Sequence, residues 1–525
     1  MKKLTWMTIC ILLIALFPLQ QTNAAVLNPN KMNTYEQLSK DVKLLSQKYP
    51  SIISVRSIGK TPYGRTIWAV KLGKGDATLL INAAHHAREW PTTNLTMKMI
   101  EQYANAYMKN TNISGYSVRN VLNQTSIWFV PMVNPDGVTL QQKGVNAFPQ
   151  KVRKSLIAMN DGSTNFKRWK ANAQGIDLNR QYPGGWYKSS IKHSWYMNYS
   201  GTRPLQAPEA KAMYDFTMWV NPETEVSYHS SGHILYWGYK QTGSQYKRDL
   251  SIANKLHNIT GYKIVKPTPN QKGGGFTDWF TYTLKKPGFT PEISSIVNNS
   301  NPPLSIMGDE WNRNKKVGLY LASLSSSYWE KRLTQVKKVI TTFSEKRIYN
   351  RPEKEQATNQ TLPAGTYQVN ATKSGWYRIS NPKLGPIWID GKHVLNGAPK
   401  NIDETVLINQ DTTVKDEPTT NSHATAIGVQ VIKAVQTWGS YIGIRTQSGL
   451  KWISSKNVTR NYNPTSTQIT LTVDENVDTY SYPTTRAEKV GSIQAGTTVK
   501  SIAIWNGWIQ IKTGHTTGWI KWDEK

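Results

Sequence analysis

The sequence predicts an α/β domain followed by several small all-β modules. Two observations point to this arrangement. Strand-like and helical stretches alternate up to about Phe343, and beyond it short β-type runs are separated by turn residues. With 525 residues the chain is too long for one ordinary core. Hydrophobic residues make up 38% and charged residues 18%, which is typical of a globular rather than a disordered protein.

The first residues have the pattern of a secretory signal. Two lysines precede an apolar run from about Ile9 to Phe17, and Thr22-Asn23-Ala24 supplies small residues for cleavage. We therefore predict a signal peptide over residues 1–24 and a secreted protein. The apolar run is too short to span a bilayer, and no later stretch is long enough, so no transmembrane segment is expected.

Charge and cysteine content narrow the chemistry further. The formal net charge is +31, and most of the excess lies before Glu355. For an exported protein such a basic surface favours anionic wall polymers or membrane surfaces as partners, not nucleic acid, although it also serves solubility. The single cysteine, Cys10, lies inside the predicted signal, so a metal site in the mature chain must be built from His, Asp and Glu.

The first domain is predicted to span residues 25–343. A helix begins after Thr34, which with Gln37 has the spacing of a capping box. The run 78–83 is apolar on both faces, as in a central strand that is buried on both sides. Periodicity predicts helices at 93–109 and 208–219 and strands at 53–58, 67–72, 78–83, 126–133, 225–228 and 288–293.

The remainder of the chain has a different texture. Residues 344–360 are polar and contain Pro352, which indicates a linker. A weak repeat follows, with a Trp-Ile pair at 388–389, 452–453 and 519–520. We predict three modules at 361–400, 401–462 and 463–525, of which the second is degenerate. They resemble bacterial SH3-like modules, which implies binding to a cell-wall polymer, although the Trp-Ile pairs themselves fit the module cores.

Candidate metal ligands follow two of the predicted strands. His86 and Glu89 come directly after the buried run 78–83, and residues three apart on a helical turn point the same way. His229 ends the strand-like run 225–228 and is the best third ligand for a zinc ion with an open position. Each residue alone also fits a surface ion pair or a strand-end histidine, so the prediction depends on the set.

A larger set of motifs occurs in a fixed order along the first domain. They are His-Ala-Arg-Glu-Trp (86–90), Asn-Pro-Asp-Gly (134–137), Gly-Ile-Asp-Leu-Asn-Arg (175–180), Tyr-His-Ser (228–230), Asp-Trp (278–279) and Pro-Glu-Ile (291–293). With these motifs, residues from about Lys31 to Phe343 look like the zinc carboxypeptidase family of metallopeptidases, which implies a mixed sheet flanked by helices and one Zn²⁺ per chain. The neighbourhood of Trp169 and Asp177 resembles the branch that cleaves γ-D-glutamyl–diaminopimelate bonds.

The resemblance implies a role for each matching residue. His86, Glu89 and His229 would hold the zinc ion. Glu292 would take a proton from the attacking water and return it to the leaving amine. Asp177 would hydrogen-bond the outer nitrogen of a zinc histidine, here His86. Asn179 and Arg180 would grip a substrate carboxylate, because the guanidinium fork donates two parallel hydrogen bonds. Arg88 would add positive charge for substrate binding.

The sequence departs from the family pattern in two places. Lys170 stands where many members have an arginine that stabilises the oxyanion, so it would act as a point charge. Asn270 stands where many have a mobile tyrosine, which leaves Tyr262 and Tyr282 as candidates without an assignment. In addition, Thr277 stands at the expected base of the specificity pocket and is neither acidic nor large and apolar. It therefore argues against a preference for leaving residues with basic or bulky aromatic side chains.

Three functions fit these observations. The first is a secreted, wall-associated zinc metallopeptidase that cuts peptidoglycan stem peptides. The second is a general secreted metallocarboxypeptidase that removes C-terminal residues from proteins. The third is a wall-binding protein with an inactive peptidase domain, which intact ligands and Glu292 argue against. The repeats favour the first, because a nutritional enzyme gains little from being tethered.

Overall fold

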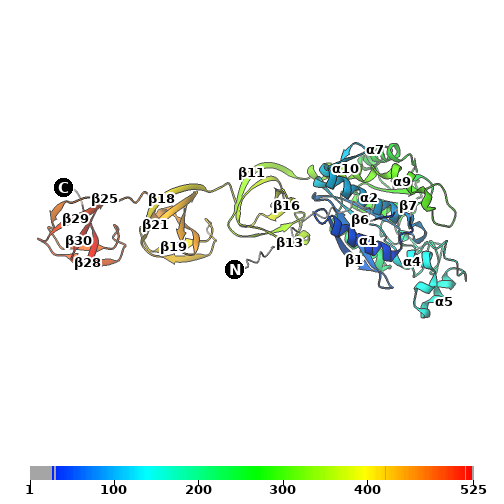
Figure 1. Ribbon diagram of the computed structural model, residues 1–525, viewed down its shortest axis with the longest axis horizontal. Helices are drawn as coiled ribbons and strands as arrows, with labels where there is room; N and C mark the ends of the chain where they lie inside the picture. Colours follow the sequence, from blue (N-terminus) through cyan, green and yellow to red (C-terminus); the bar gives the residue numbers. More distant parts are fainter. Residues whose placement is uncertain (1–26, 29–30, 420, 515, 523–525) are drawn as a thin grey trace, which may run out of the picture. The chain divides into compact units, whose positions relative to one another are not determined.

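The computed structural model describes residues 27–28, 31–419, 421–514 and 516–522, so the predicted signal peptide at 1–24 lies outside the described residues. The chain divides into two compact units, Met1–Arg332 and Leu333–Lys525, and Figure 1 shows their elements. In the part of the chain that the structure describes, no helix has both the length and the apolar character needed to cross a membrane.

An eight-stranded mixed sheet forms the centre of the first unit (Figure 1). The order across the sheet is β1 (Ile53–Lys60), β2 (Thr66–Leu72), β6 (Thr125–Val130), β3 (Ala77–Ala83), β7 (Thr224–Ser230), β10 (Gly288–Ile293), β8 (Ile234–Tyr236) and β9 (Lys263–Ile264). β6, β3, β7 and β10 are parallel to one another, whereas β2 and β8 run antiparallel to their inner neighbours. A short hairpin, β4 (Asn112–Ile113) with β5 (Tyr116–Ser117), lies apart from this sheet.

Helices cover both faces of the sheet because its inner strands are apolar on both faces. On β3, Leu79 and Ile81 belong to one hydrophobic core and Leu80 to the other, and all three are fully buried, as the sequence predicts. The first core includes residues of α1 (Tyr35–Lys48), α2 (Pro91–Lys109), α3 (Val118–Gln124), α7 (Gly243–Thr260), α9 (Met307–Asn314) and α10 (Val317–Glu330). The second includes residues of α6 (Pro208–Val220) and α8 (Phe276–Leu284).

A third, smaller core lies outside the sheet. Leu140 of α4 (Pro135–Lys143) and Leu156 of α5 (Gln150–Met159) pack there with Trp169. This cluster fixes the loop that follows α5 and carries Lys170.

The residues at the ends of α1 and α2 explain where these helices begin and end. The Thr34 hydroxyl accepts a hydrogen bond from the Gln37 amide at 3.2 Å and caps α1, although the Gln37 side chain bonds Asp41 instead of completing the box. Pro91 opens α2, where its missing N–H costs nothing, and Asn110 ends it in the left-handed conformation. The six predicted strands and three predicted helices are all present, with bounds shifted by a few residues at most.

The second unit consists of three antiparallel sheets, each with its own hydrophobic core. The first comprises β11 (Thr334–Thr342), β12 (Lys346–Tyr349), β13 (Ala357–Leu362), β14 (Gly365–Lys373), β15 (Trp376–Asn381), β16 (Gly385–Asp390) and β17 (Val394–Asn396). The second comprises β18 (Lys400–Ile408), β19 (Thr412–Lys415), β20 (Ala424–Ile427), β21 (Gln430–Trp438), β22 (Tyr441–Thr446), β23 (Gly449–Ser454) and β24 (Val458–Thr459). The third comprises β25 (Thr465–Ser466), β26 (Thr470–Thr472), β27 (Val477–Tyr480), β28 (Lys489–Ile493), β29 (Thr498–Trp505), β30 (Trp508–Thr513) and β31 (Thr516–Lys521).

The predicted linker at 344–360 is wrong. These residues contain β12 and most of β13, which pair with each other and join the first small sheet through Tyr349 and Trp388. That sheet begins with β11, before the predicted domain end at residue 343. The polar composition misled the prediction because most side chains of this edge hairpin are exposed or half-buried, and Ile348 and Leu362 are the two that belong to the buried core.

The internal repeat corresponds to a repeated fold. The first two small sheets have equivalent strand orders. The order is β13-β12-β16-β15-β14-β11-β17 in the first and β20-β19-β23-β22-β21-β18-β24 in the second. Trp388, Trp452 and Trp519 occupy equivalent strands and are 0%, 0% and 2% exposed. The tryptophans of the Trp-Ile pairs are therefore core residues, as their spacing indicated.

Candidate active site

The parallel strands β3, β7 and β10 bring the predicted site residues to one edge of the sheet. In the parallel register Ala83 lies beside Tyr228, and Glu292 lies beside His229. His86 follows β3 by three residues, so it arrives at the same edge. The carboxyl ends of parallel strands are where α/β sheets bind ligands.

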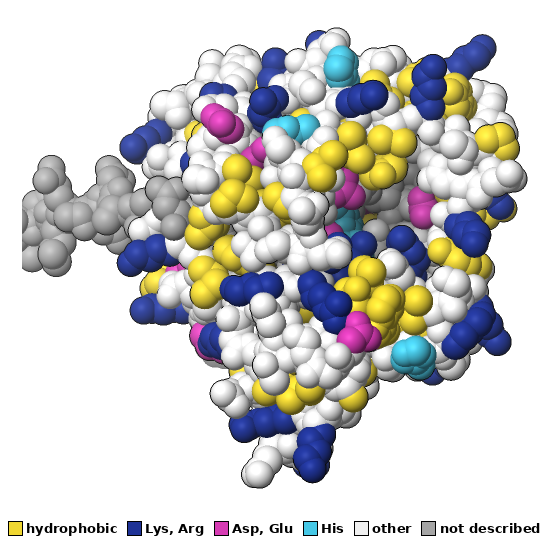
Figure 2. Space-filling model, turned by 90° about the vertical axis from the view of Figure 1, so that its right-hand side faces the viewer, with side chains coloured by type: hydrophobic (Ala, Val, Ile, Leu, Met, Phe, Trp, Pro, Cys, Tyr) yellow, Lys and Arg dark blue, Asp and Glu magenta, His cyan; other side chains and the backbone are white. Residues whose placement is uncertain are grey.

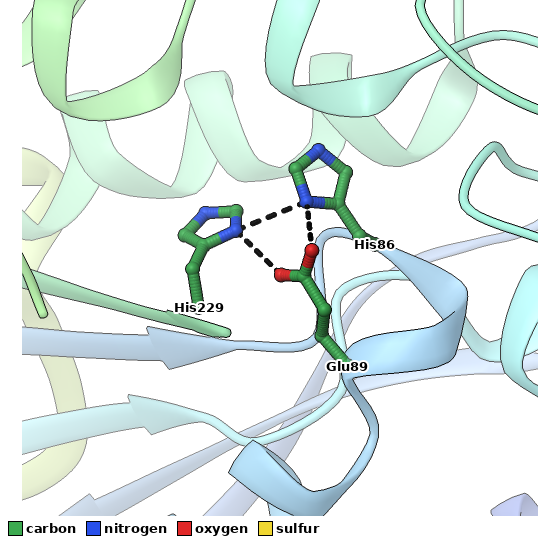
Figure 3. A group of neighbouring side chains, drawn as sticks. All are labelled: His86, Glu89 and His229. Carbon is green, nitrogen blue, oxygen red and sulfur yellow. Dashed lines mark hydrogen bonds and ion pairs between the residues drawn. The ribbon is translucent and has the colours of Figure 1, made fainter. Parts of the chain in front are cut away.

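His86, Glu89 and His229 converge on one point, as Figure 3 shows. Glu89 lies on a 3₁₀ turn (Ala87–Glu89) that begins directly after His86. Its carboxylate oxygens lie 2.8 Å from His86 Nδ1 and 2.8 Å from His229 Nδ1, and the two imidazole nitrogens are 3.1 Å apart. All three side chains are buried.

This donor set fits a zinc ion. Two imidazole nitrogens that face each other repel unless a proton or a cation lies between them, and a carboxylate beside them adds negative charge. Ligand atoms of a tetrahedral zinc site are separated by about 3.3 Å, close to the 2.8 and 3.1 Å separations observed here. The three ligands predicted from the sequence are therefore brought together with the spacing that zinc requires.

Asp177 lies within hydrogen-bond distance of His86, as predicted. Its Oδ1 lies 3.1 Å from His86 Nε2, the nitrogen that points away from the cluster. Burial raises the pKa of Asp177, but His86, Lys170 and Arg180 outweigh it and hold the pKa well below its usual range. The resulting carboxylate fixes which nitrogen of His86 faces the metal site.

Glu292 lies beside the cluster on β10. Burial and the charge of Glu89 raise its pKa to about 8, while Lys170, Arg88 and Arg180 oppose that shift. A carboxyl group with such a pKa can both accept and return a proton near neutral pH. The transfer of a proton by Glu292 stays a prediction from the sequence.

A cavity of about 370 Å³ opens next to these residues. Figure 2 shows a hollow on one face of the first unit, with acidic and histidine side chains inside it and lysine and arginine around it. Its lining includes predicted site residues and others that the sequence did not single out. They are His86, Lys170, Asn179, Arg180, Tyr187, Tyr236, Gln271, Lys272, Gly275, Thr277, Asp278, Thr290 and Glu292.

Asn179 and Arg180 both reach this cavity. The Asn179 side-chain oxygen accepts from the Phe276 amide at 2.9 Å, which leaves its NH₂ group for a ligand. Burial lowers the pKa of Arg180, but Asp177, Tyr187 and Asp278 outweigh it, so the guanidinium stays charged. Arg88 is placed differently, because it donates to the Arg168 carbonyl and to Asn299 and is not among the cavity-lining residues.

Lys170 lines the cavity close to the cluster, since its charge lowers the pKa values of Asp177 and Glu292. We expect Lys170→Ala to lower kcat by about 10²-fold or more and to change KM less, because its charge matters most when the oxyanion forms. Steady-state kinetics would measure both constants, with Lys167→Ala, an exposed lysine on the same loop, as the matched control. A raised KM with unchanged kcat would instead make Lys170 a substrate-binding residue.

The structure does not bring the two candidate tyrosines to the site. Tyr262 is buried against Glu310 and Asn314, and Tyr282 is 40% exposed and packs against Tyr239. Tyr187 and Tyr236 line the cavity instead. No local signal marks them, because Tyr236 reaches the cavity only through the antiparallel pairing of β8 with β10.

Tyr236 lies close enough to Glu292 for the charge of that carboxylate to act on it. Burial raises its pKa, the charge of Glu292 raises it further, and Arg180 opposes. We expect Tyr236→Phe to lower kcat/KM by about tenfold, because a phenol that can bond a charged group is lost. Tyr282→Phe is the matched control, since both side chains are 40% exposed. Equal effects of the two substitutions would contradict a role for Tyr236.

The chain is similar in sequence to known proteins. The chain is 32% identical over 308 residues to gamma-D-glutamyl-L-diamino acid endopeptidase 1 of Lysinibacillus sphaericus, covering 58% of this chain and 75% of that protein. It is 34% identical over 269 residues to the uncharacterized protein YqgT of Bacillus subtilis, covering 50% and 70%. Among solved structures, thrombin activatable fibrinolysis inhibitor aligns with a TM-score of 0.45 at 17% identity, covering 58% of this chain and 79% of that one.

Family profiles match both parts of the chain. Residues 476–524 match the bacterial SH3 domain, which includes most of the third small sheet. Residues 38–315 match the zinc carboxypeptidase profile, and this range contains the three metal-site residues and Glu292. The chain therefore belongs to the zinc carboxypeptidase family of metallopeptidases.

Proposed function

We propose that this protein is a secreted zinc metallopeptidase that hydrolyses the γ-D-glutamyl–diaminopimelate bond in peptidoglycan stem peptides. The observation that carries the proposal is that Asn179 and Arg180 line the same cavity as Glu292, beside the metal site. Diaminopimelate offers a carboxylate on the residue whose amine leaves, and this pair can hold it. The name of the Lysinibacillus sphaericus relative, an endopeptidase acting on γ-D-glutamyl-L-diamino acid bonds, supports the same bond.

Each residue has a separate task in the proposed reaction. When zinc is held by His86, Glu89 and His229, it lowers the pKa of water and polarises a carbonyl. Glu292 accepts a proton from the attacking water and returns it to the leaving nitrogen. Lys170 stabilises the negative charge that develops on the carbonyl oxygen. Asn179 and Arg180 fix the substrate carboxylate, so the scissile bond lies beside Glu292.

The bond specificity can be tested with defined substrates. Purified muropeptides with a tripeptide stem are expected to be cut between D-glutamate and diaminopimelate, which mass spectrometry would show. Stems that continue beyond diaminopimelate should be cut more slowly, because their α-carboxylate is already in a peptide bond. Arg180→Ala is expected to remove this preference for the free carboxylate.

The second candidate function predicts a different outcome. A general secreted carboxypeptidase would use the same metal site, Glu292 and Arg180. If plain peptides lose their C-terminal residues far faster than muropeptides are cut, the wall-peptide proposal is wrong and this alternative replaces it.

We also propose that the three small sheets hold the enzyme on the cell wall. A match to the bacterial SH3 domain over residues 476–524 supports this. The full-length protein is expected to sediment with purified peptidoglycan more strongly than a variant that ends after Arg332, where the first unit ends. Equal sedimentation of the two proteins would contradict anchoring through the small sheets. The part of the binding that depends on charge should weaken as the salt concentration rises.

A further inference from the structure

A buried carboxyl group on α9 contacts the residues that follow β10. Glu310 is 1% exposed, and its Oε1 accepts hydrogen bonds from the Ser294 amide at 3.1 Å and from His233 Nε2 at 2.7 Å. Its Oε2 accepts from the Tyr262 hydroxyl and from the Asn314 side-chain amide, the latter at 3.2 Å. The Asn314 amide also donates to the Tyr262 oxygen at 2.9 Å, so the proton of that hydroxyl is directed to Glu310. All four neighbouring groups are therefore donors, and a carboxylate can accept from all of them.

Two of these donors follow the strands that carry the site. Glu292 precedes Ser294 by two residues, and His229 precedes His233 by four. The Ser294 carbonyl accepts from two amides of the β7–β8 loop at 2.9 and 2.8 Å, which ties the segment after β10 to the segment after β7. Ser294 and His233 have positive φ angles of 72° and 48°, a conformation that non-glycine residues keep only where the surrounding structure enforces it. Glu310 supplies such a contact to each of them.

The helix that carries Glu310 is packed into the first hydrophobic core. Met307 of α9 is buried in that core with residues of α2, α7 and α10, and Trp311 packs against it. Glu310 itself is not among the described residues that line the cavity or form the metal cluster. It therefore connects a well-packed helix to the ends of β7 and β10 without touching the place where a substrate would lie.

Loss of the Glu310 carboxylate would change the end of β10. The Ser294 amide would remain without a partner in a buried position, because Ser294 is 2% exposed, and the backbone would have to move until that amide found another acceptor. Glu292 is only two residues away, and a general base must stay within hydrogen-bond reach of the proton that it accepts. A displacement of about 1 Å in such a group can cost about 10²-fold in rate.

We propose that Glu310 is a positioning residue for Glu292, acting through Ser294 and the β7–β8 loop. The inference rests on the proposed function in one respect, that Glu292 transfers the proton, and is independent of which peptide bond is cut. It predicts that Glu310 affects turnover only while residue 292 carries a carboxyl group. A purely structural role of Glu310 predicts instead the same loss of turnover whether residue 292 is glutamate or glutamine.

A double-mutant cycle on the full-length enzyme tests this coupling. The wild type, Glu310→Gln, Glu292→Gln and the double variant are compared in kcat, KM and zinc content. The substrate is a muropeptide with a tripeptide stem or a plain peptide, whichever the wild type cuts faster. We expect Glu310→Gln to lower kcat by about 10- to 100-fold with little change in KM or zinc content, because its NH₂ group would face donors. In the Glu292→Gln background the same substitution should lower kcat by less than about twofold.

A second buried glutamate provides the matched control. Glu223, directly before β7, accepts from the Thr78 amide of β3 at 2.6 Å, so it ties two strands together at their ends opposite the metal site. Glu223→Gln should lower the melting temperature and leave kcat unchanged. This control separates the loss of a buried hydrogen bond in general from the loss of the one beside Glu292.

The outcomes separate this inference from the proposed function. Equal losses from Glu310→Gln in both backgrounds, an unchanged kcat, or loss of zinc would overturn the positioning role while the proposed function stands. Near-native turnover of Glu292→Gln would show that the proposed base is wrong, and the positioning role with it. If Glu310→Gln fails to fold, His233→Ala carries the same test, because it removes one partner of the same carboxylate at a half-buried position. Equal losses from His233→Ala in both backgrounds would then overturn the inference.

Discussion

Replacing Glu292 by glutamine is expected to lower kcat by about 10²- to 10⁴-fold without loss of bound zinc. The amide keeps the size of the carboxyl group but cannot accept a proton from water or return it to the leaving nitrogen. Glu292 lies beside His229 in the parallel register of β10 and β7, next to the metal-site residues. Single-turnover and steady-state rates, together with zinc content by atomic absorption, would measure the effect.

A shortened carboxylate provides the control for Glu292. Glu292→Asp keeps the acid but withdraws it from the reacting atoms, so its rate should lie between the wild-type and glutamine values. Near-native turnover of Glu292→Gln would show that another group acts as the base. Loss of zinc in Glu292→Gln would show instead that the carboxyl group supports the metal site.

Removal of the metal is expected to abolish activity altogether. The full-length protein should bind one zinc ion per chain, lose all turnover on chelation and regain it when zinc is restored. His229→Ala should prevent binding, because only two of the three converging donors remain. Asp177→Asn should weaken zinc affinity by a smaller factor, about 10- to 100-fold, since it acts through His86.

A histidine outside the metal site provides the control for His229→Ala. His257 lies on α7, where its Nδ1 lies 2.8 Å from the Tyr262 carbonyl oxygen, outside the cluster. His257→Ala should keep both zinc and turnover. A variant of His229 that retained stoichiometric zinc would contradict the proposed ligand set.

The sequence by itself determined the elements and the reacting groups of the first unit. Apolar periodicity located β3 as a doubly buried strand, and the motifs named His86, Glu89, His229 and Glu292. These signals are local. The burial of a strand is predicted from consecutive apolar residues, and a ligand motif is recognised from the spacing of its residues. The tryptophans at 388, 452 and 519 were found in the same way, as one position repeated in three modules.

Amino-acid composition gave a wrong prediction for a segment whose side chains mostly face solvent. Residues 344–360 were predicted as a linker because a solvated edge hairpin and a linker contain the same kinds of residues. Only the pairing of β12 with β13 and β16 distinguishes them. Pairing depends on partners that are distant in the chain, which composition does not report.

The tertiary structure alone decided what surrounds the reacting groups. Tyr236 reaches the cavity because β8 pairs antiparallel with β10, and Glu225 lies behind Thr277 although 52 residues separate them in the chain. In the sequence Glu225 is indistinguishable from a solvated strand-end glutamate, since burial of a carboxyl group is set by distant segments that pack over it. The metal-site residues and Glu292 were therefore predictable from local pattern, whereas the residues around them depend on strand register and packing.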